Sequence, residues 1–193
     1  MNREEMIKDD FKDHEATIDQ YLKFNNPDEK GIEIEVLTWK KPGTSNYMVR
    51  YLVSGNTLCV YGDLGEAVYQ WSQDVTLDWI STLDLHYFKG KCQASEVGRD
   101  FKEWSREKAF DTLKHMEKEG YFNWSDIELT DGLDALYDSR EWEEWLRENG
   151  SEILGEDYWD WAFSIGHVIN TRCMYHFIGL KMAMEQIKLK NVE

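Results

Sequence analysis

The sequence predicts an α+β fold: a small three- to four-stranded antiparallel meander packed by helices and followed by an acidic helical C-terminal half. Three observations predict it. Apolar and polar residues alternate over residues 31–62, helical periodicity replaces this alternation from residue 63, and acidic residues are interleaved with tryptophans over residues 121–160. Because a length of 193 residues is typical of one domain, we expect a single domain over residues 1–193.

The N-terminal part is expected to contain one helix and then the meander. A helix over residues 1–24 is predicted to stop at Asn25-Asn26-Pro27-Asp28. The strands and turns of the meander are then expected in this order: residues 32–36, the turn 41–43, residues 47–53, the hairpin loop 54–56 and residues 58–61. Strands this short need helices to cover one face of their sheet.

Residues 63–120 are expected to be helical. The predicted helices are, in order, residues 63–71, a helix capped by Thr76, and residues 99–118, which Gly120 ends. The segment 85–88 is ambiguous and also fits a short fourth strand.

Residues 121–193 are predicted to form short acidic helices and one long final helix. Thr130 or Asp131 is expected to cap the first of them and Ser139 the next, which is predicted to end at Asn149-Gly150. Apolar residues then recur with a helical period over residues 165–189, so this final helix is expected to be the central packing helix.

Negative charge is concentrated in one stretch of the chain. Residues 121–160 hold 13 acidic and two basic residues, and so carry −11 of the net charge of −16. Five of the nine tryptophans lie in or beside this stretch: Trp124, Trp142, Trp145, Trp159 and Trp161. Because a tryptophan can bury a large apolar area, we expect the segment to fold and to hold its carboxylates in fixed positions. Such a surface attracts cationic partners and opposes direct binding to nucleic acid.

The location of the protein is expected to be cytoplasmic, without contact with a membrane. No apolar run approaches the roughly 20 residues that a membrane span needs. The first residues lack the apolar segment of a secretory signal. The cysteines, Cys59, Cys92 and Cys173, are odd in number and far apart, which is typical of reduced thiols.

Candidate metal and phosphate sites are weak. His167, Cys173 and His176 share the expected final helix, but their spacing favours core packing over a metal site, which commonly takes ligands in close pairs. The stretch Gly62-Asp63-Leu64-Gly65 is interpreted as a strand-to-helix turn, with Asp63 as a helix cap, rather than as a phosphate cradle. We therefore expect neither a metal nor a cofactor.

Candidate catalytic groups are equally weak. Cys92 has His86 nearby in the sequence, but no catalytic signature surrounds either residue. Paired carboxylates, such as Glu143-Glu144 or Asp157 with Asp160, arise without any catalytic role in a chain with 38 acidic residues. We expect a protein that is not an enzyme, and a small enzyme that uses one of these groups stays as a rival hypothesis.

A more specific hypothesis is that the acidic segment imitates a nucleic acid. Glu141, Glu144 and Glu148 are spaced three and four residues apart, so they are expected to share one face of their helix, and its tryptophans are expected to point off that face. Carboxylates four residues apart on a helix lie about 6 Å apart, a spacing of the same order as that of successive phosphates. A row of them can occupy a cleft lined by Lys and Arg, with tryptophans as anchors of the contact. A solvated face and core tryptophans are the alternative interpretation. The expected partner-binding residues are Asp134, Asp138, Glu141, Glu144, Glu148, Glu152, Glu156 and Asp157.

One stretch of the chain resembles a known group of proteins. Residues 60–71 read Val-Tyr-Gly-Asp-Leu-Gly-Glu-Ala-Val-Tyr-Gln-Trp. They are similar to a signature of small proteins from Firmicutes phages and mobile elements, in which a strand ends in a YGDLG turn that opens a helix reading AVYQW. The similarity extends over about Tyr47 to Lys91, and some members of the group resemble type II-A anti-CRISPR proteins, which inhibit Cas9.

The resemblance implies a viral protein that counters host defence in the bacterial cytoplasm by binding Cas9, alone or with its guide RNA. Cas9 holds nucleic acid in positively charged channels, which an ordered acidic face would fit. The expected function is therefore inhibition of Cas9 by protein–protein contact, through a surface that blocks DNA or guide RNA binding. A phage or mobile-element accessory protein that binds another host factor is the second alternative.

Overall fold

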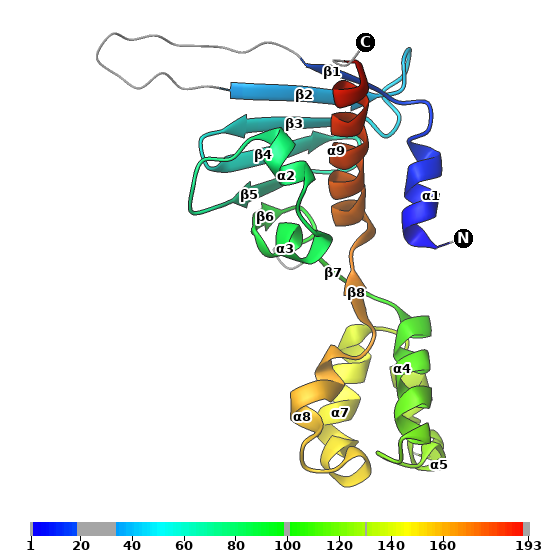
Figure 1. The fold of residues 1–193 in the computed structure, drawn as a ribbon. Coiled ribbons are helices and arrows are strands. Elements are labelled where there is room, and N and C mark those ends of the chain that lie inside the picture. Colours follow the sequence, from blue (N-terminus) through cyan, green and yellow to red (C-terminus); the bar gives the residue numbers. More distant parts are fainter. Residues whose placement is uncertain (1, 19–33, 99–100, 130, 191–193) are drawn as a thin grey trace. The chain divides into compact units, whose positions relative to one another are not determined.

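The computed structural model describes residues 2–18, 34–98, 101–129 and 131–190 (Figure 1). The chain divides into two compact units. We call Met1–Phe101 with Asn170–Glu193 the sheet unit, and Lys102–Ile169 the acidic unit. Both boundaries fall within segments that the sequence predicted as continuous helices, residues 99–118 and 165–189.

The sheet unit contains a six-stranded antiparallel sheet, which confirms the α+β class but is larger than the three- to four-stranded sheet predicted. The strands lie in the sheet in chain order, and the predicted meander forms the second, third and fourth of them. Their bounds are β1 (Glu15–Ile18), β2 (Ile34–Lys40), β3 (Val49–Ser54), β4 (Thr57–Gly62), β5 (Ala67–Gln70) and β6 (Cys92–Ser95). The stop predicted at 25–28 lies outside the described residues.

Two of the additional strands occupy segments predicted as helices. The helix expected over residues 1–24 is only α1 (Arg3–Asp10), after which β1 pairs with β2. Residues 67–70, expected within the helix 63–71, form β5 between β4 and β6. In β5 the buried residues Ala67 and Tyr69 alternate with half-buried Val68, the two-residue period of a strand. A single helical turn is unstable by itself, whereas a strand between two neighbours gains hydrogen bonds on both sides.

The loop that contains the YGDLG stretch is a tight connection between β4 and β5, and it opens no helix. Gly62 has a φ of +144° and Gly65 a φ of +94°, conformations that side chains disfavour. The Asp63 carboxylate, predicted as a helix cap, instead accepts a hydrogen bond from the backbone N–H of Tyr47 at 2.8 Å. The distinctive residues of this stretch therefore serve the connection between two strands.

Substitution of Gly62 tests how tightly this connection is built. A Cβ at residue 62 would lie 2.2 Å from the backbone oxygen of Met48, besides having an unfavourable φ. We expect Gly62→Ala to lower the free energy of unfolding by about 2 kcal/mol or more. Urea denaturation measures this change. Gly90→Ala is the control, because a Cβ there meets no atom within 4 Å, and an equal loss in both variants would contradict the expectation.

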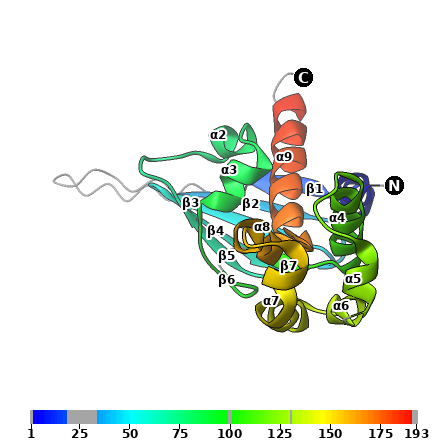
Figure 2. The same ribbon diagram turned by 90° about the horizontal axis from the view of Figure 1, so that it is seen from below.

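Helices α2 (Leu77–Ser81), α3 (Leu85–Gly90) and α9 (Thr171–Lys190) gather on one side of the sheet (Figures 1 and 2). Thr76 caps α2 as predicted, since its hydroxyl accepts a hydrogen bond from the backbone N–H of Trp79 at 3.2 Å. The ambiguous segment 85–88 is helical. Helix α9 packs on α1, α2, α3 and strands β1 to β3, so the prediction of a central packing helix is confirmed.

The acidic unit is mainly helical. Its first and last residues form a short antiparallel strand pair, β7 (Lys102–Trp104) with β8 (His167–Ile169). The predicted helix 99–118 therefore begins only at Arg106, and the predicted helix 165–189 only at Thr171. Between the strands lie α4 (Arg106–Lys118), α5 (Trp124–Leu129), α6 (Gly132–Ala135), α7 (Ser139–Leu154), α8 (Tyr158–Trp161) and the 3-10 turn η1 (Ala162–Ser164).

The caps in the acidic unit differ from those predicted. Asp131 has a left-handed backbone conformation and makes no capping hydrogen bond with its side chain, and Thr130 lies outside the described residues. Helix α7 is capped by Asp138 rather than Ser139. It also continues through the predicted stop at Asn149-Gly150. Gly150 is buried there, and a Cβ on it would lie 2.4 Å from the ring of Tyr158, so the glycine serves close packing rather than helix termination.

Candidate protein-binding surface

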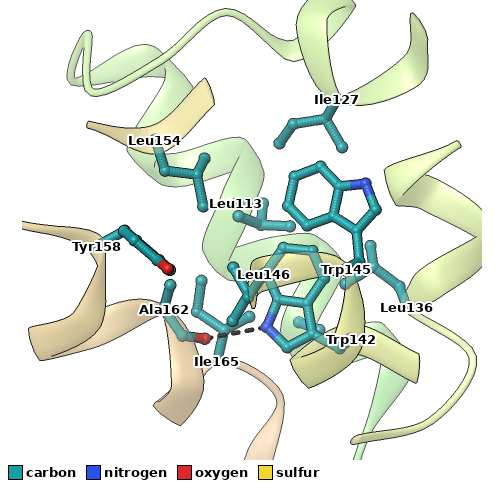
Figure 3. Close-up of a cluster of buried hydrophobic side chains, with 11 residues drawn as sticks. Leu113, Ile127, Leu136, Trp142, Trp145, Leu146, Leu154, Tyr158, Ala162 and Ile165 are labelled. Atoms are coloured by element: carbon teal, nitrogen blue, oxygen red, sulfur yellow. Dashed lines mark hydrogen bonds between the residues drawn. The ribbon is translucent and has the colours of Figure 1, made fainter. Parts of the chain in front are cut away.

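Buried aromatic side chains hold the acidic unit together (Figure 3). Trp142 and Trp145 project from α7, and their rings stack with centroids 4.9 Å apart and planes 14° from parallel. The indole N–H of Trp142 donates a hydrogen bond to the backbone oxygen of Ala162 at 3.0 Å. These contacts link α7 to η1. The other buried members of the cluster are Ala109, Leu113, Ile127, Leu136, Leu146, Leu154, Tyr158 and Ile165.

Four of the predicted partner-binding residues form a row along the exposed side of α7, which we call the α7 acidic row. It consists of Glu141, Glu144, Glu148 and Glu152, spaced three, four and four residues apart. All four side chains are exposed, whereas Trp142, Trp145 and Leu146 of the same helix are buried. The separation of carboxylates and tryptophans onto different faces of this helix, predicted from the spacing, is therefore confirmed.

The other predicted residues flank the row at the two ends of α7. Asp134 and Asp138 precede the helix, and Glu156 and Asp157 follow it; all are exposed. Asp138 has a structural role as well, because its carboxylate accepts hydrogen bonds from the backbone N–H groups of residues 140 and 141 at 2.8 and 2.9 Å. The N-terminal end of this helix thus favours a carboxylate at that position.

The basic residues of α7 leave most of this charge uncompensated. Arg140 pairs with Glu144 of the row at 3.3 Å, and Arg147 pairs with Glu143 outside the row at 3.2 Å. Both pairs are solvent-exposed, so neither fixes its partners strongly. The acidic unit holds 18 acidic and seven basic residues, a net charge of −11, against −5 for the rest of the chain. The acidic unit therefore presents a strongly negative surface on a packed core.

The structure separates the five tryptophans that the sequence grouped together. Trp142 and Trp145 are buried, and Trp124 and Trp161 are half-buried against the same core. Trp159 differs from them, because 58% of its surface is exposed. The sequence could not distinguish it, since all five share the same acidic surroundings.

The thiols of Cys92 and Cys173 in the sheet unit are buried. Cys92 is 2% exposed, and its thiol contacts the backbone oxygen of Ala94 at 3.4 Å, while His86 is exposed on α3. Cys173 is fully buried, and this burial raises the pKa of its thiol to about 12. A nucleophile has to be accessible to a substrate, which these buried thiols are not.

His176 links α9 to the YGDLG loop. Its Nε2 lies 3.1 Å from the backbone oxygen of Leu64, and its Nδ1 lies 3.3 Å from the Tyr69 hydroxyl. Burial lowers the pKa of His176 from its ordinary 6.5 to about 4, and burial also lowers the pKa of His14. His167, expected on the same helix, lies instead in β8 of the acidic unit. Among the described residues, no group of three or more His, Cys, Asp and Glu side chains could hold a metal.

The lowered pKa of His176 predicts a loss of stability in acid. The unfolded chain takes up this proton below pH 6.5, whereas the folded protein resists it down to about pH 4. Stability is therefore fully present above pH 6.5 and is expected to fall by up to about 1.4 kcal/mol per pH unit as the pH drops towards 4. Urea denaturation at a series of pH values should show a smaller dependence for His176→Gln than for the exposed-site control His115→Gln. Equal slopes would contradict the expectation.

The described part of the chain contains no helix that is both long and apolar enough to cross a membrane. The class of protein that these observations define is an α+β protein with a separate, strongly acidic helical unit. No protein-family model, curated protein or solved structure matches this chain.

Proposed function

We propose that this protein inhibits a nucleic-acid-binding protein by contacting its basic surface with the acidic unit. The observation that carries the proposal is the α7 acidic row, whose four carboxylates are exposed on a helix that buried tryptophans hold in place. Because the carboxylates belong to a packed helix, binding does not require the ordering of a flexible acidic tail.

The geometry of the row is suited to a cleft that normally holds a phosphate backbone. Successive carboxylates of the row lie about one helical turn apart, or roughly 5–6 Å. A positively charged channel would be attracted to them before contact, which speeds association and makes it sensitive to salt. Competition with nucleic acid follows, since both ligands need the same basic side chains.

Cas9 is the partner that we propose, because of the similarity of residues 60–71 to the phage and mobile-element signature. The test is DNA cleavage by purified Cas9 with its guide RNA, with and without a molar excess of this protein. We expect inhibition that weakens when salt is raised from about 0.05 M to about 0.3 M. Full cleavage at low salt and large excess would refute the Cas9 assignment.

Co-purification distinguishes which step of Cas9 action is blocked and whether Cas9 or another host protein is the partner. Binding to Cas9 without guide RNA but not to the loaded complex would indicate a block of guide loading, and binding to the loaded complex would indicate a block of DNA entry. If Cas9 is not bound, capture from host lysate tests the second alternative, an accessory protein for another basic host factor. A protein captured by the wild type and lost with a neutralised α7 acidic row would support that alternative.

A further inference from the structure

Trp159 is an exposed aromatic side chain that its neighbours hold in place. Its ring stacks on that of Phe163, with centroids 5.1 Å apart and planes 15° from parallel. The centroid of the Tyr158 ring lies 4.5 Å from that of Trp159. Tyr158 is itself buried against Gly150 of α7. The indole therefore has neighbours that fix its position, although 58% of the residue's surface remains exposed.

The surroundings of this indole favour a cation. Glu156, Asp157 and Asp160 lie next to Trp159 in the chain, and all three side chains are exposed. The face of an indole ring attracts cations, and of the aromatic side chains it does so most strongly. A large exposed aromatic side chain is also costly to leave in water, and tryptophan is one of the residue types enriched in binding hot spots.

We infer that Trp159 is the docking point for an arginine side chain of the basic partner, an inference that rests on the proposed function. A planar guanidinium can lie flat on the indole and at the same time donate hydrogen bonds to a neighbouring carboxylate, which a lysine ammonium does less well. The acidic unit already uses this contact within itself, since the guanidinium of Arg106 lies 4.5 Å from the ring centre of Tyr137.

Two labelled peptides of ten residues, one of arginine and one of lysine, test the inference with the full chain. Both carry the same charge, so fluorescence anisotropy separates guanidinium recognition from charge alone. We expect the wild type to bind the arginine peptide about tenfold more tightly, as one good cation–π contact allows. Trp159→Leu should remove this preference, and Trp159→Phe should retain part of it. Tyr121→Leu, at another exposed aromatic residue of the acidic unit, should leave the preference unchanged.

The possible outcomes separate the inference from the function on which it rests. Equal binding of the two peptides by the wild type, or an unchanged preference in Trp159→Leu, would overturn the inference. If both peptides then still lose affinity when the α7 acidic row is neutralised, the proposed function survives. If the wild type binds neither peptide at low salt, both are overturned.

Discussion

Trp142→Ala is expected to unfold the acidic unit or to leave it barely stable. The side chain of Trp142 is fully buried, stacks on Trp145 and donates a hydrogen bond to the backbone oxygen of Ala162. Its removal would leave a large cavity and take away one of the two hydrogen bonds that the Ala162 oxygen accepts, since the other comes from the backbone N–H of Ile165. We expect a loss of about 3–5 kcal/mol, mostly from the cavity. Far-UV circular dichroism during thermal unfolding measures the loss of helix.

The matched control is Trp159→Ala, the same chemical change at a position that is 58% exposed. We expect it to cost less than about 1 kcal/mol. Hydrogen exchange locates the damage in Trp142→Ala: protection should be lost in α4 and α7 and kept in strands β3 and β4 of the sheet unit. A similar loss of stability in both variants would show that the burial of Trp142 does not stabilise the acidic unit.

Neutralising the α7 acidic row is expected to abolish most binding to a basic partner while the fold persists. The variant carries Glu→Gln at residues 141, 144, 148 and 152, which are all exposed. At about 0.5 kcal/mol for each exposed charge, the loss is about 2 kcal/mol, or about 30-fold in affinity. The dependence of binding on salt should decrease as well. Titration calorimetry against Cas9, with and without guide RNA, measures both effects.

A control variant removes four charges elsewhere. Glu15→Gln, Glu66→Gln, Asp74→Asn and Glu185→Gln are exposed positions in the sheet unit, so the net charge changes equally. We expect this variant to bind within about threefold of the wild type, since none of the four positions belongs to the acidic unit. Equal losses in the two variants would mean that total charge, rather than the α7 acidic row, drives binding.

Two predictions from the sequence rested on strong local patterns and agree with the structure. In the meander, Val49, Tyr51 and Val53 were identified as one face of a strand because they occupy every second position. This alternation holds in β3, where the three side chains are buried and those between them are half-buried. The side of α7 that carries carboxylates was identified from spacings of three and four residues. Both patterns follow from backbone geometry alone, so the sequence contains all the information that is needed.

The errors lie in short segments whose structure depends on distant partners. Ala67–Gln70 has too few residues for periodicity to decide between helix and strand, and its pairing with β6 at Cys92–Ser95 decides it. The strand pair β7 with β8 likewise joins residues more than 60 positions apart. A local sequence pattern shows neither pairing, because each depends on contacts between segments that are far apart in the chain.

By itself, the sequence determined where the charge lies and that this acidic segment carries enough aromatic surface to fold. Charge and apolar content are properties of the residues and need no coordinates. Only the tertiary structure decided that residues 102–169 form a separate unit, that Trp142 is buried and that Trp159 is exposed. Burial belongs to the assembled unit, since a side chain is removed from water only by neighbours that the rest of the chain brings to it.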